Sequence, residues 1–190
     1  MTAQTLLEEL KAVTEFATKD LILPTARQDP SARPYAREEP DARAPAVYIP
    51  RVPDGRQAKK KVPYVLHMVE SFHDWHDSTH IPFAQIVVRS ILTVWSANEM
   101  EGLFYLYNLY ETIRVDLLKR INIGKQFTLD LGSENGLHFT PYTELEPPYF
   151  AGEMISVWRV PGVGREIRFD KKIDPRPKCP GEGVHIEYGM

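Results

Sequence analysis

The sequence predicts an α+β fold, in which a mainly antiparallel sheet carries helices packed on one face. Two stretches, at about residues 5–18 and after Ser96, space their apolar residues as amphipathic helices do. Several shorter stretches are rich in β-branched and aromatic residues. These β-rich stretches flank the second helix in pairs, which favours hairpins and therefore antiparallel strands.

The composition is that of an ordinary globular protein and gives no reason to expect binding to nucleic acid or to a membrane. The 190 residues suit one domain, and 43% hydrophobic with 26% charged residues is ordinary for a globular chain. A formal net charge of -3 provides no general attraction for nucleic acid or anionic membrane. The single cysteine, Cys179, forms no intramolecular disulfide, and neither a basic signal peptide nor an apolar run of about 18 residues is present. We expect assembly in a reducing cytoplasm and no membrane association.

The chain divides into four predicted parts. Residues 1–23 supply a first helix and a short strand, and residues 62–164 form the main α+β core. Residues 24–61 form a long proline-rich arm or loop, because proline disfavours both helix and sheet ladders. Residues 165–190 form an irregular C-terminal tail. The arm either remains a loose loop or becomes ordered against a neighbouring subunit.

The first helix is expected at residues 5–18, with Thr5 as a possible N-cap. Its apolar positions are Leu6, Leu7, Leu10, Val13 and Phe16. Residues 20–23 then favour a short strand.

Residues 62–70 and 83–95 read as two strands of a hairpin, joined by a polar loop at residues 71–82. In the second strand, one face is expected to be apolar: Ile86, Val88, Leu92 and Val94.

Ser96 with Glu99 forms a capping-box signature for the second helix, and Asn98 is the alternative cap. Gly124 is expected to end this helix. Its apolar stripe consists of Leu103, Leu106, Tyr110, Ile113 and Leu117. Later strands are expected at Phe127, Leu129 and Leu131, at residues 153–160 and, as a short edge strand, at residues 165–169.

The sequence predicts no catalytic residue, no cofactor and no metal. Residues 72–80 contain three histidines and two acids, which could bind zinc or iron, but no ligand pair of matching spacing occurs elsewhere. Cys179 lies in the proline-rich tail, where no rigid pocket would lower its pKa. No common nucleotide-binding or hydrolase motif is present. We therefore interpret the chain as a non-enzyme.

The run Lys59–Lys61 is interpreted as a solvated basic segment rather than a phosphate site. Tyr105, Tyr107 and Tyr110 lie on the second helix, which favours core packing or a subunit contact over stacking on nucleic acid.

From residue 63 to Pro161, the order of elements resembles the tail terminator, or tail completion, proteins of siphophages. The individual motifs are moderately specific, and their order and spacing are more so. They occur at residues 84–89, 98–102, 106–114, 123–129, 147–154 and 158–161. The arm and the tail are longer and richer in proline than the family pattern.

The resemblance implies a structural virion protein at the head-proximal end of a phage tail. Such a protein would form a hexameric ring that caps the tail tube, ends tube polymerisation and binds the head-tail connector or stopper protein. DNA would be present only as it passes through the lumen of the ring. The candidate contact residues are Glu99, Glu101, Pro147, Pro148, Tyr149, Phe150, Arg33, Arg37 and Arg43.

Two alternatives remain at this stage. The chain could be a connector or stopper protein on the head side of the same joint, or a metal-dependent enzyme that uses residues His73–His80. Location in the virion separates the two structural alternatives, and a metal assay separates both of them from the enzyme.

Overall fold

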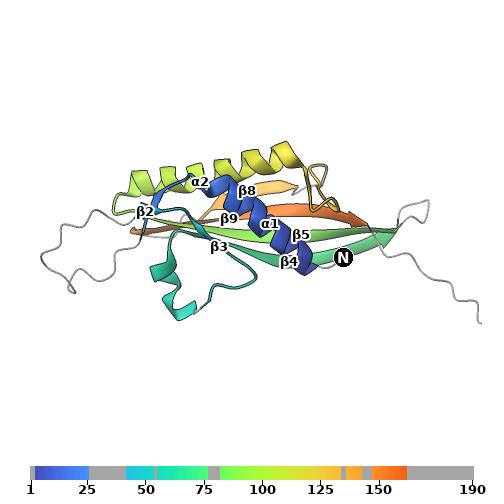
Figure 1. Cartoon of the computed structure of the whole chain (residues 1–190), viewed down its shortest axis with the longest axis horizontal. Coiled ribbons are helices and arrows are strands. Elements are labelled where there is room, and N and C mark those ends of the chain that lie inside the picture. The colour runs from blue at the N-terminus through green and yellow to red at the C-terminus, as the bar shows by residue number, and fades with distance from the viewer. Residues whose placement is uncertain are drawn as a thin grey trace, which may run out of the picture.

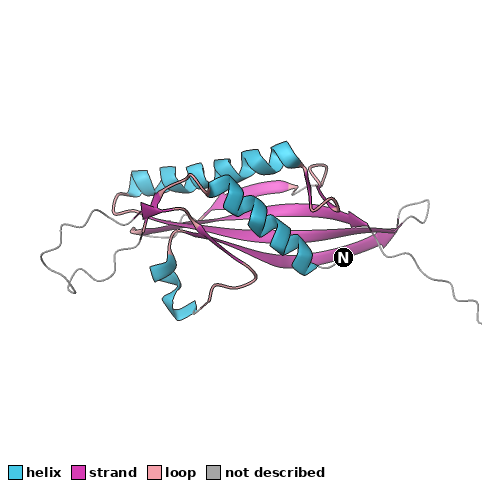
Figure 2. Cartoon of the chain, in the orientation of Figure 1, coloured by secondary structure: helices cyan, strands magenta, loops and turns pink. Residues whose placement is uncertain are grey.

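The computed structural model describes residues 3–25, 42–53, 55–76, 82–133, 136–142 and 147–161. Over these residues the chain is an α+β protein with two α-helices and a curled mixed sheet (Figures 1 and 2). The sheet runs along the long axis of the molecule, with α1 in front of it and α2 along its upper border in Figure 1. Neither described helix is long and apolar enough to cross a membrane. The α+β class predicted from the sequence is confirmed.

The main sheet has the strand order β3–β4–β5–β9–β7–β6, and β8 also pairs with β9. All of its pairs are antiparallel except β3 with β4, which is parallel, so the sheet is mixed rather than purely antiparallel. Its strands are β3 (Ala46–Tyr48), β4 (Tyr64–His76), β5 (Pro82–Trp95), β6 (Asn122–Ile123), β7 (Phe127–Leu129), β8 (Leu137–Pro141) and β9 (Tyr149–Pro161).

Strand β3 lies within the predicted arm. Val47 is buried beneath α1 and pairs in register with Val65 of β4, so the last part of the arm belongs to the core of the same chain. A separate two-stranded sheet pairs β1 (Leu23–Pro24) with β2 (Ala42–Arg43). Of the strand predicted at residues 20–23, only Leu23 lies in β1. The 3-10 helix η2 (Gly55–Lys61) then leads into β4.

Strands β4 and β5 form the predicted hairpin, but the predicted polar loop is wrong. β4 continues to His76 and β5 begins at Pro82, so most of the polar stretch is strand. The register shifts between Val69 and Ser71, which marks a β-bulge. Polar side chains are tolerated here because residues 72–74 are exposed rather than part of the core.

One face of the sheet packs under both helices. The predicted apolar face of β5 is confirmed, since Ile86, Val88, Leu92 and Val94 are all buried. Residues from β9 continue this face, and Trp158 and Met154 are completely buried there. Burial of each large apolar side chain stabilises the fold by about 1.5–3 kcal/mol.

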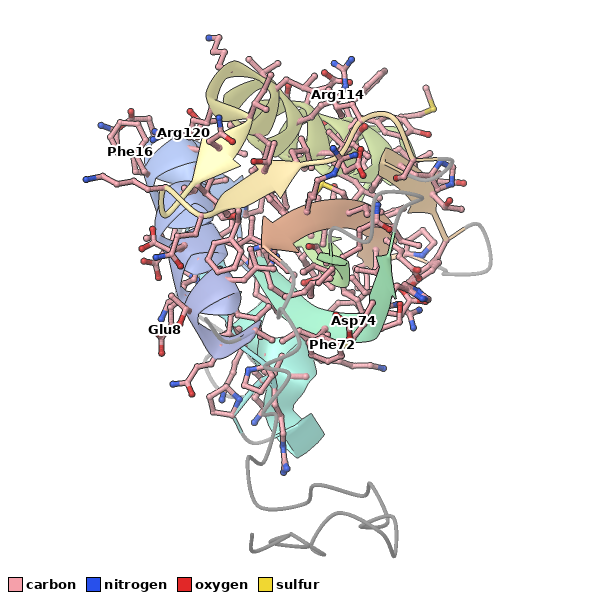
Figure 3. The ribbon with its side chains drawn as sticks, turned by 90° about the vertical axis from the view of Figure 1, so that its right-hand side faces the viewer. Glu8, Phe16, Phe72, Asp74, Arg114 and Arg120 are labelled. Atoms are coloured by element: carbon pink, nitrogen blue, oxygen red, sulfur yellow. The ribbon has the colours of Figure 1, made fainter. Side chains whose placement is uncertain are left out.

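Helix α1 (Ala3–Thr18) buries Leu6, Leu7 and Leu10 as predicted. It begins at Ala3, so Thr5 lies inside the helix and is not its N-cap. Phe16 is 56% exposed, and Figure 3 shows it beside Arg120. The Lys19 ammonium lies 4.7 Å and the Arg120 guanidinium 5.2 Å from the centroid of its ring. The small hydroxyl residues Thr14 and Thr18 are buried instead, and both hydroxyls are satisfied: that of Thr14 lies 3.0 Å from Nε2 of His67, and that of Thr18 donates to the Thr14 carbonyl at 2.8 Å.

Helix α2 (Glu99–Arg120) is capped by Asn98, whose side-chain oxygen accepts a hydrogen bond from the Met100 amide at 3.0 Å. The alternative cap is therefore confirmed, and the capping box is wrong. Ser96 instead accepts a hydrogen bond from the Asn98 amide at 3.1 Å.

The predicted core face of α2 is largely confirmed, because Leu106, Ile113 and Leu117 are buried. Leu109 is buried where the stripe predicted Tyr110. The Tyr110 ring stacks on Phe139 of β8, with centroids 4.3 Å apart, and is only half-buried.

The helix ends at Arg120, and Gly124 lies in the turn between β6 and β7, so Gly124 is not the helix stop. Phe127 and Leu129 are buried in β7 as predicted, whereas Leu131 is 49% exposed. β9 begins earlier than the predicted strand, and β6 and β8 were not predicted at all. The edge strand predicted at residues 165–169 and the rest of the tail lie outside the described residues.

Candidate interface at one end of the sheet

Three segments meet at the end of the sheet that holds the start of α2. Trp95, the last residue of β5, pairs with Tyr149, the first residue of β9. The Ser96 amide donates a hydrogen bond to the Pro148 carbonyl at 3.0 Å. The Pro147–Tyr149 turn and the first turn of α2 are therefore held side by side, although they lie far apart in the sequence.

Most of the candidate contact residues from these segments face outward. Glu99, Glu101 and Pro147 are exposed, while Pro148 and Tyr149 are half-buried. Next to the two glutamates, Met100 and Phe104 are each 62% exposed. The two carboxylates lie in the first helical turn, where the helix dipole favours negative charge. This end therefore combines acidic and large apolar side chains on one surface.

Phe150 is placed differently from its neighbours in the turn. It is only 5% exposed and packs against Gly102 of α2. A Cβ at position 102 would lie 2.1 Å from a carbon of the Phe150 ring. Because Gly102 has no side chain, there is space for the Phe150 ring beside α2. Phe150 therefore supports the candidate interface from within the fold and is too buried to contact a partner.

Basic residues gather at the same end. Arg43 in β2 donates a hydrogen bond to the Lys61 carbonyl at 2.6 Å, and the Lys61 ammonium donates to the Pro53 carbonyl. The Lys59 ammonium lies 5.4 Å from the centroid of the Tyr149 ring, which connects η2 to the turn before β9. Arg33 and Arg37 lie outside the described residues.

A buried polar cluster connects α1 to the sheet. His67 of β4 is completely buried, its Nε2 lies 3.0 Å from the Thr14 hydroxyl, and its Nδ1 lies 2.7 Å from the Ser90 hydroxyl. A neutral imidazole has one donor and one acceptor nitrogen, so these two hydroxyls satisfy the ring. Burial lowers the pKa of His67 from 6.5 to about 3. The ring is therefore neutral and has no exposed surface, which suits a structural role.

Sequence reasoning missed His67. The available signal was a single histidine at an inward position of an apolar strand, between Val65 and Val69, but only the fold supplies Thr14 and Ser90 as its partners.

The face of the sheet opposite the helices carries two ionic clusters. In the first, Glu153 of β9 accepts hydrogen bonds from Arg89 at 2.5 Å and from the Tyr142 hydroxyl at 2.7 Å. The buried Nε of Arg89 makes no hydrogen bond to the described part of the chain. Burial and the hydrogen bond to Glu153 raise the pKa of Tyr142, so the phenol stays protonated.

In the second cluster, Asp130 accepts hydrogen bonds from Gln85 at 2.6 Å and from Arg159 at 3.0 Å. Burial acts to raise the pKa of Asp130, but these hydrogen bonds and the Arg159 charge outweigh it and leave the pKa below its usual value. The carboxylate also accepts a hydrogen bond from the Gly132 amide at 3.2 Å, which shapes the turn after β7. Both clusters join strands across the sheet, and the carboxylate of each is hydrogen-bonded to an arginine.

The histidine-rich stretch is partly described. His73 is exposed on β4, with its Nε2 3.1 Å from the Ser71 hydroxyl. The side chain of His76 and all of His80 lie outside the described residues. Among the residues that are described, no group of three or more His, Cys, Asp or Glu side chains is placed to hold a metal ion. Lys59 and Lys60 are exposed, as predicted for a solvated basic run, whereas Lys61 is half-buried and its ammonium donates to the Pro53 carbonyl.

Neither a scan against protein-family models nor a search of curated proteins finds a match to this chain.

Proposed function

We propose that this protein is a structural component of a bacteriophage virion, a tail terminator that assembles as a hexameric ring on the tail tube. In this role it ends tube polymerisation and binds the head-tail connector or stopper protein. The resemblance of the sequence over residues 63–161 supplies the family, the number six and the partners. The work of such a protein is contact rather than catalysis.

The observation that carries the proposal is the candidate interface at one end of the sheet. Residues chosen on resemblance alone, from the α2 start and the turn before β9, lie side by side with Arg43 and Lys59 nearby. The surface contains both signs of charge and two apolar side chains that are 62% exposed. Head-to-tail contacts form a ring where the rotation between neighbours closes, and complementary charges fix the register of such contacts.

Charge reversal at this surface tests the role in assembly. The variant Glu99→Lys with Glu101→Lys should lower the fraction of hexamer measured by native mass spectrometry, because both carboxylates are exposed at the proposed contact. The matched control is Glu8→Lys with Glu15→Lys, which makes the same charge change on the exposed side of α1. Equal hexamer fractions in both variants would show that Glu99 and Glu101 do not lie at a contact between subunits.

Location in the particle tests the function itself. Cryo-EM of the intact virion should find this chain as a ring directly on the last ring of the tail tube. A position on the head side of the joint would instead identify a connector or stopper protein, and absence from the virion would contradict both structural assignments.

A further inference from the structure

Within the described part of the chain, one edge of the main sheet has no pairing strand over most of its length. β3 pairs only with residues 64–66 of β4, whereas β4 extends to His76. No described strand pairs with the outer side of β4 over residues 67–76. The outward N–H and C=O groups on that side make no ladder hydrogen bonds to a described strand, and such edges bind additional strands readily.

The side chains along this open edge are suited to a partner strand. Phe72 is 60% exposed although it shares a sheet face with its buried neighbour Ile86. Glu70 and Asp74 are exposed on either side of it, and neither is held by a described ion pair. In Figure 3, Phe72 and Asp74 lie close together at the end of β4 nearest the viewer. An added strand would cover the Phe72 ring, and basic residues would complement the two acids.

The chain itself supplies a segment of this kind close by. Residues 165–172, which we name the basic segment, read Arg-Glu-Ile-Arg-Phe-Asp-Lys-Lys. Ile167 and Phe169 alternate with charged residues, as in a strand that covers one apolar face. Four basic residues against two acidic ones give the segment a net positive charge, which complements Glu70 and Asp74.

The position of Pro161 brings the basic segment within reach. Pro161, the end of β9, pairs with Phe83 of β5, which pairs in turn with Trp75 of β4. A strand added to the open edge would therefore lie about three strand spacings from Pro161, or about 14 Å. Four extended residues span about 13 Å, so the chain after Pro161 reaches the edge at about residue 165. A strand that starts there and returns along β4 runs antiparallel to it.

We propose that the open edge of β4 is a docking site for the basic segment of the same chain. The segment adds an antiparallel strand beside residues 70–76, covers Phe72, and pairs its cations with Glu70 and Asp74. It thereby blocks the edge against strands from other molecules. This docking site is independent of the proposed function.

Disulfide trapping in the full-length chain tests the pairing directly. Cys179 is the only native cysteine, so Cys179→Ser provides a background without thiols. His73→Cys is combined with single cysteines at each position from 165 to 172, and the yield of intrachain disulfide under mild oxidation is measured on non-reducing gels. The yield should alternate with a period of two residues and peak at one or two positions, because only side chains on the matching face come close enough.

The matched control moves the first cysteine from β4 to β7, which lies on the other side of β9 in the strand order. Thr128→Cys is exposed on β7 and pairs with Arg159, so it is also close to Pro161. It should form intrachain disulfides several-fold less than His73→Cys. Equal yields from the two positions, yields without alternation, or disulfides only between chains would each overturn the proposal.

Hydrogen exchange provides a second measurement that does not need cysteines. In the wild-type chain, outward-facing amides among residues 71–74 should exchange about tenfold more slowly than in the variant Arg168→Glu with Lys171→Glu, which weakens the docked strand. Adding Glu70→Lys and Asp74→Lys to this variant should restore much of the protection. Exchange that is equally fast in all three proteins would contradict the docked strand.

Discussion

His67 shows how one buried polar residue can join two layers of a fold. Its ring accepts and donates one hydrogen bond each, to hydroxyls of α1 and β5, and it has no contact with solvent. A charged imidazole would lose this arrangement, because one of its nitrogens could no longer accept and the charge would be buried. The residue therefore couples the packing of α1 to pH.

This coupling predicts an acid-sensitive stability. The pKa of His67 is about 3 in the folded protein and about 6.5 when unfolded, so the unfolded chain binds more protons between these values. The contribution of neutral His67 to the free energy of unfolding should therefore be fully present above about pH 6.5. Between about pH 6.5 and pH 3 it should fall by up to about 1.4 kcal/mol for each pH unit. The free energy of unfolding by urea should be measured from pH 7.5 to 4.5. It should fall more steeply with decreasing pH in the wild type than in His67→Gln. Parallel curves would show that His67 does not set the dependence.

Gly102 offers a second residue-level prediction. Gly102→Ala gains helix propensity of about 1 kcal/mol but places Cβ against the enclosed Phe150 ring. We expect the steric cost of about 1–3 kcal/mol to exceed that gain, so the variant should be less stable in urea unfolding. Adding Phe150→Leu should recover part of the loss, because the shorter side chain leaves room.

Gly132→Ala is the matched control for Gly102. A Cβ at position 132 would meet its nearest atom, Oδ1 of Asp130, at an ordinary distance of 3.5 Å. Its stability should change by less than about 0.5 kcal/mol. If Gly102→Ala behaved like this control, the close packing of Phe150 on α2 would be wrong.

At the scale of elements, α2 has two apolar stripes that face in opposite directions. The inner one contains Leu106, Leu109, Ile113 and Leu117, and the outer one contains the exposed residues Met100, Phe104, Tyr107 and Val115. Helical spacing alone does not say which stripe faces the sheet, because Met100, Phe104 and Tyr107 of the outer stripe are also three and four residues apart. The inner stripe has aliphatic residues at nearly every turn, which is why the sequence identified three of its members.

Substitutions on the two stripes should differ in cost. Leu117→Ala should lower the free energy of unfolding by about 2–5 kcal/mol, because Leu117 is fully buried and its loss leaves a cavity. Val115→Ala, at a position that is 41% exposed, should change it by less than about 0.5 kcal/mol. Similar unfolding midpoints for the two variants would mean that the inner face of α2 is assigned incorrectly.

For the molecule as a whole, the structure shows which part of the proline-rich arm can be removed without loss of a described strand. β1 and β2 are paired at its base. After them, β3 pairs with β4 and Val52 is buried, so both are part of the folded core. Residues 26–41 can therefore be replaced without breaking a described strand. A longer deletion through residue 56 would remove β2, β3 and Val52.

Replacing residues 26–41 by a short Gly-Ser linker should leave thermal unfolding of the subunit close to that of the wild type. If the arm contacts a neighbouring subunit or the tube, as the proposed function expects, assembled particles should show fewer rings or tails of irregular length in electron micrographs. Normal tails joined to heads would show that the arm is dispensable. Deleting residues 27–56 serves as the positive control for loss of subunit stability.

Local patterns in the sequence determined the α+β class, both helices, the β4–β5 hairpin and the buried face of β5, because these depend on periodicity within one segment. The sequence also brought the α2 start and the turn before β9 together as candidate contacts, through a resemblance. Only the tertiary structure decided that residues 46–48 of the arm form β3 and pair with β4. It also decided that the polar residues after Val69 continue a strand, and that Phe150 packs inward against Gly102. Each of these depends on a partner distant in the sequence, and backbone pairing or an available cavity can outweigh local preference there.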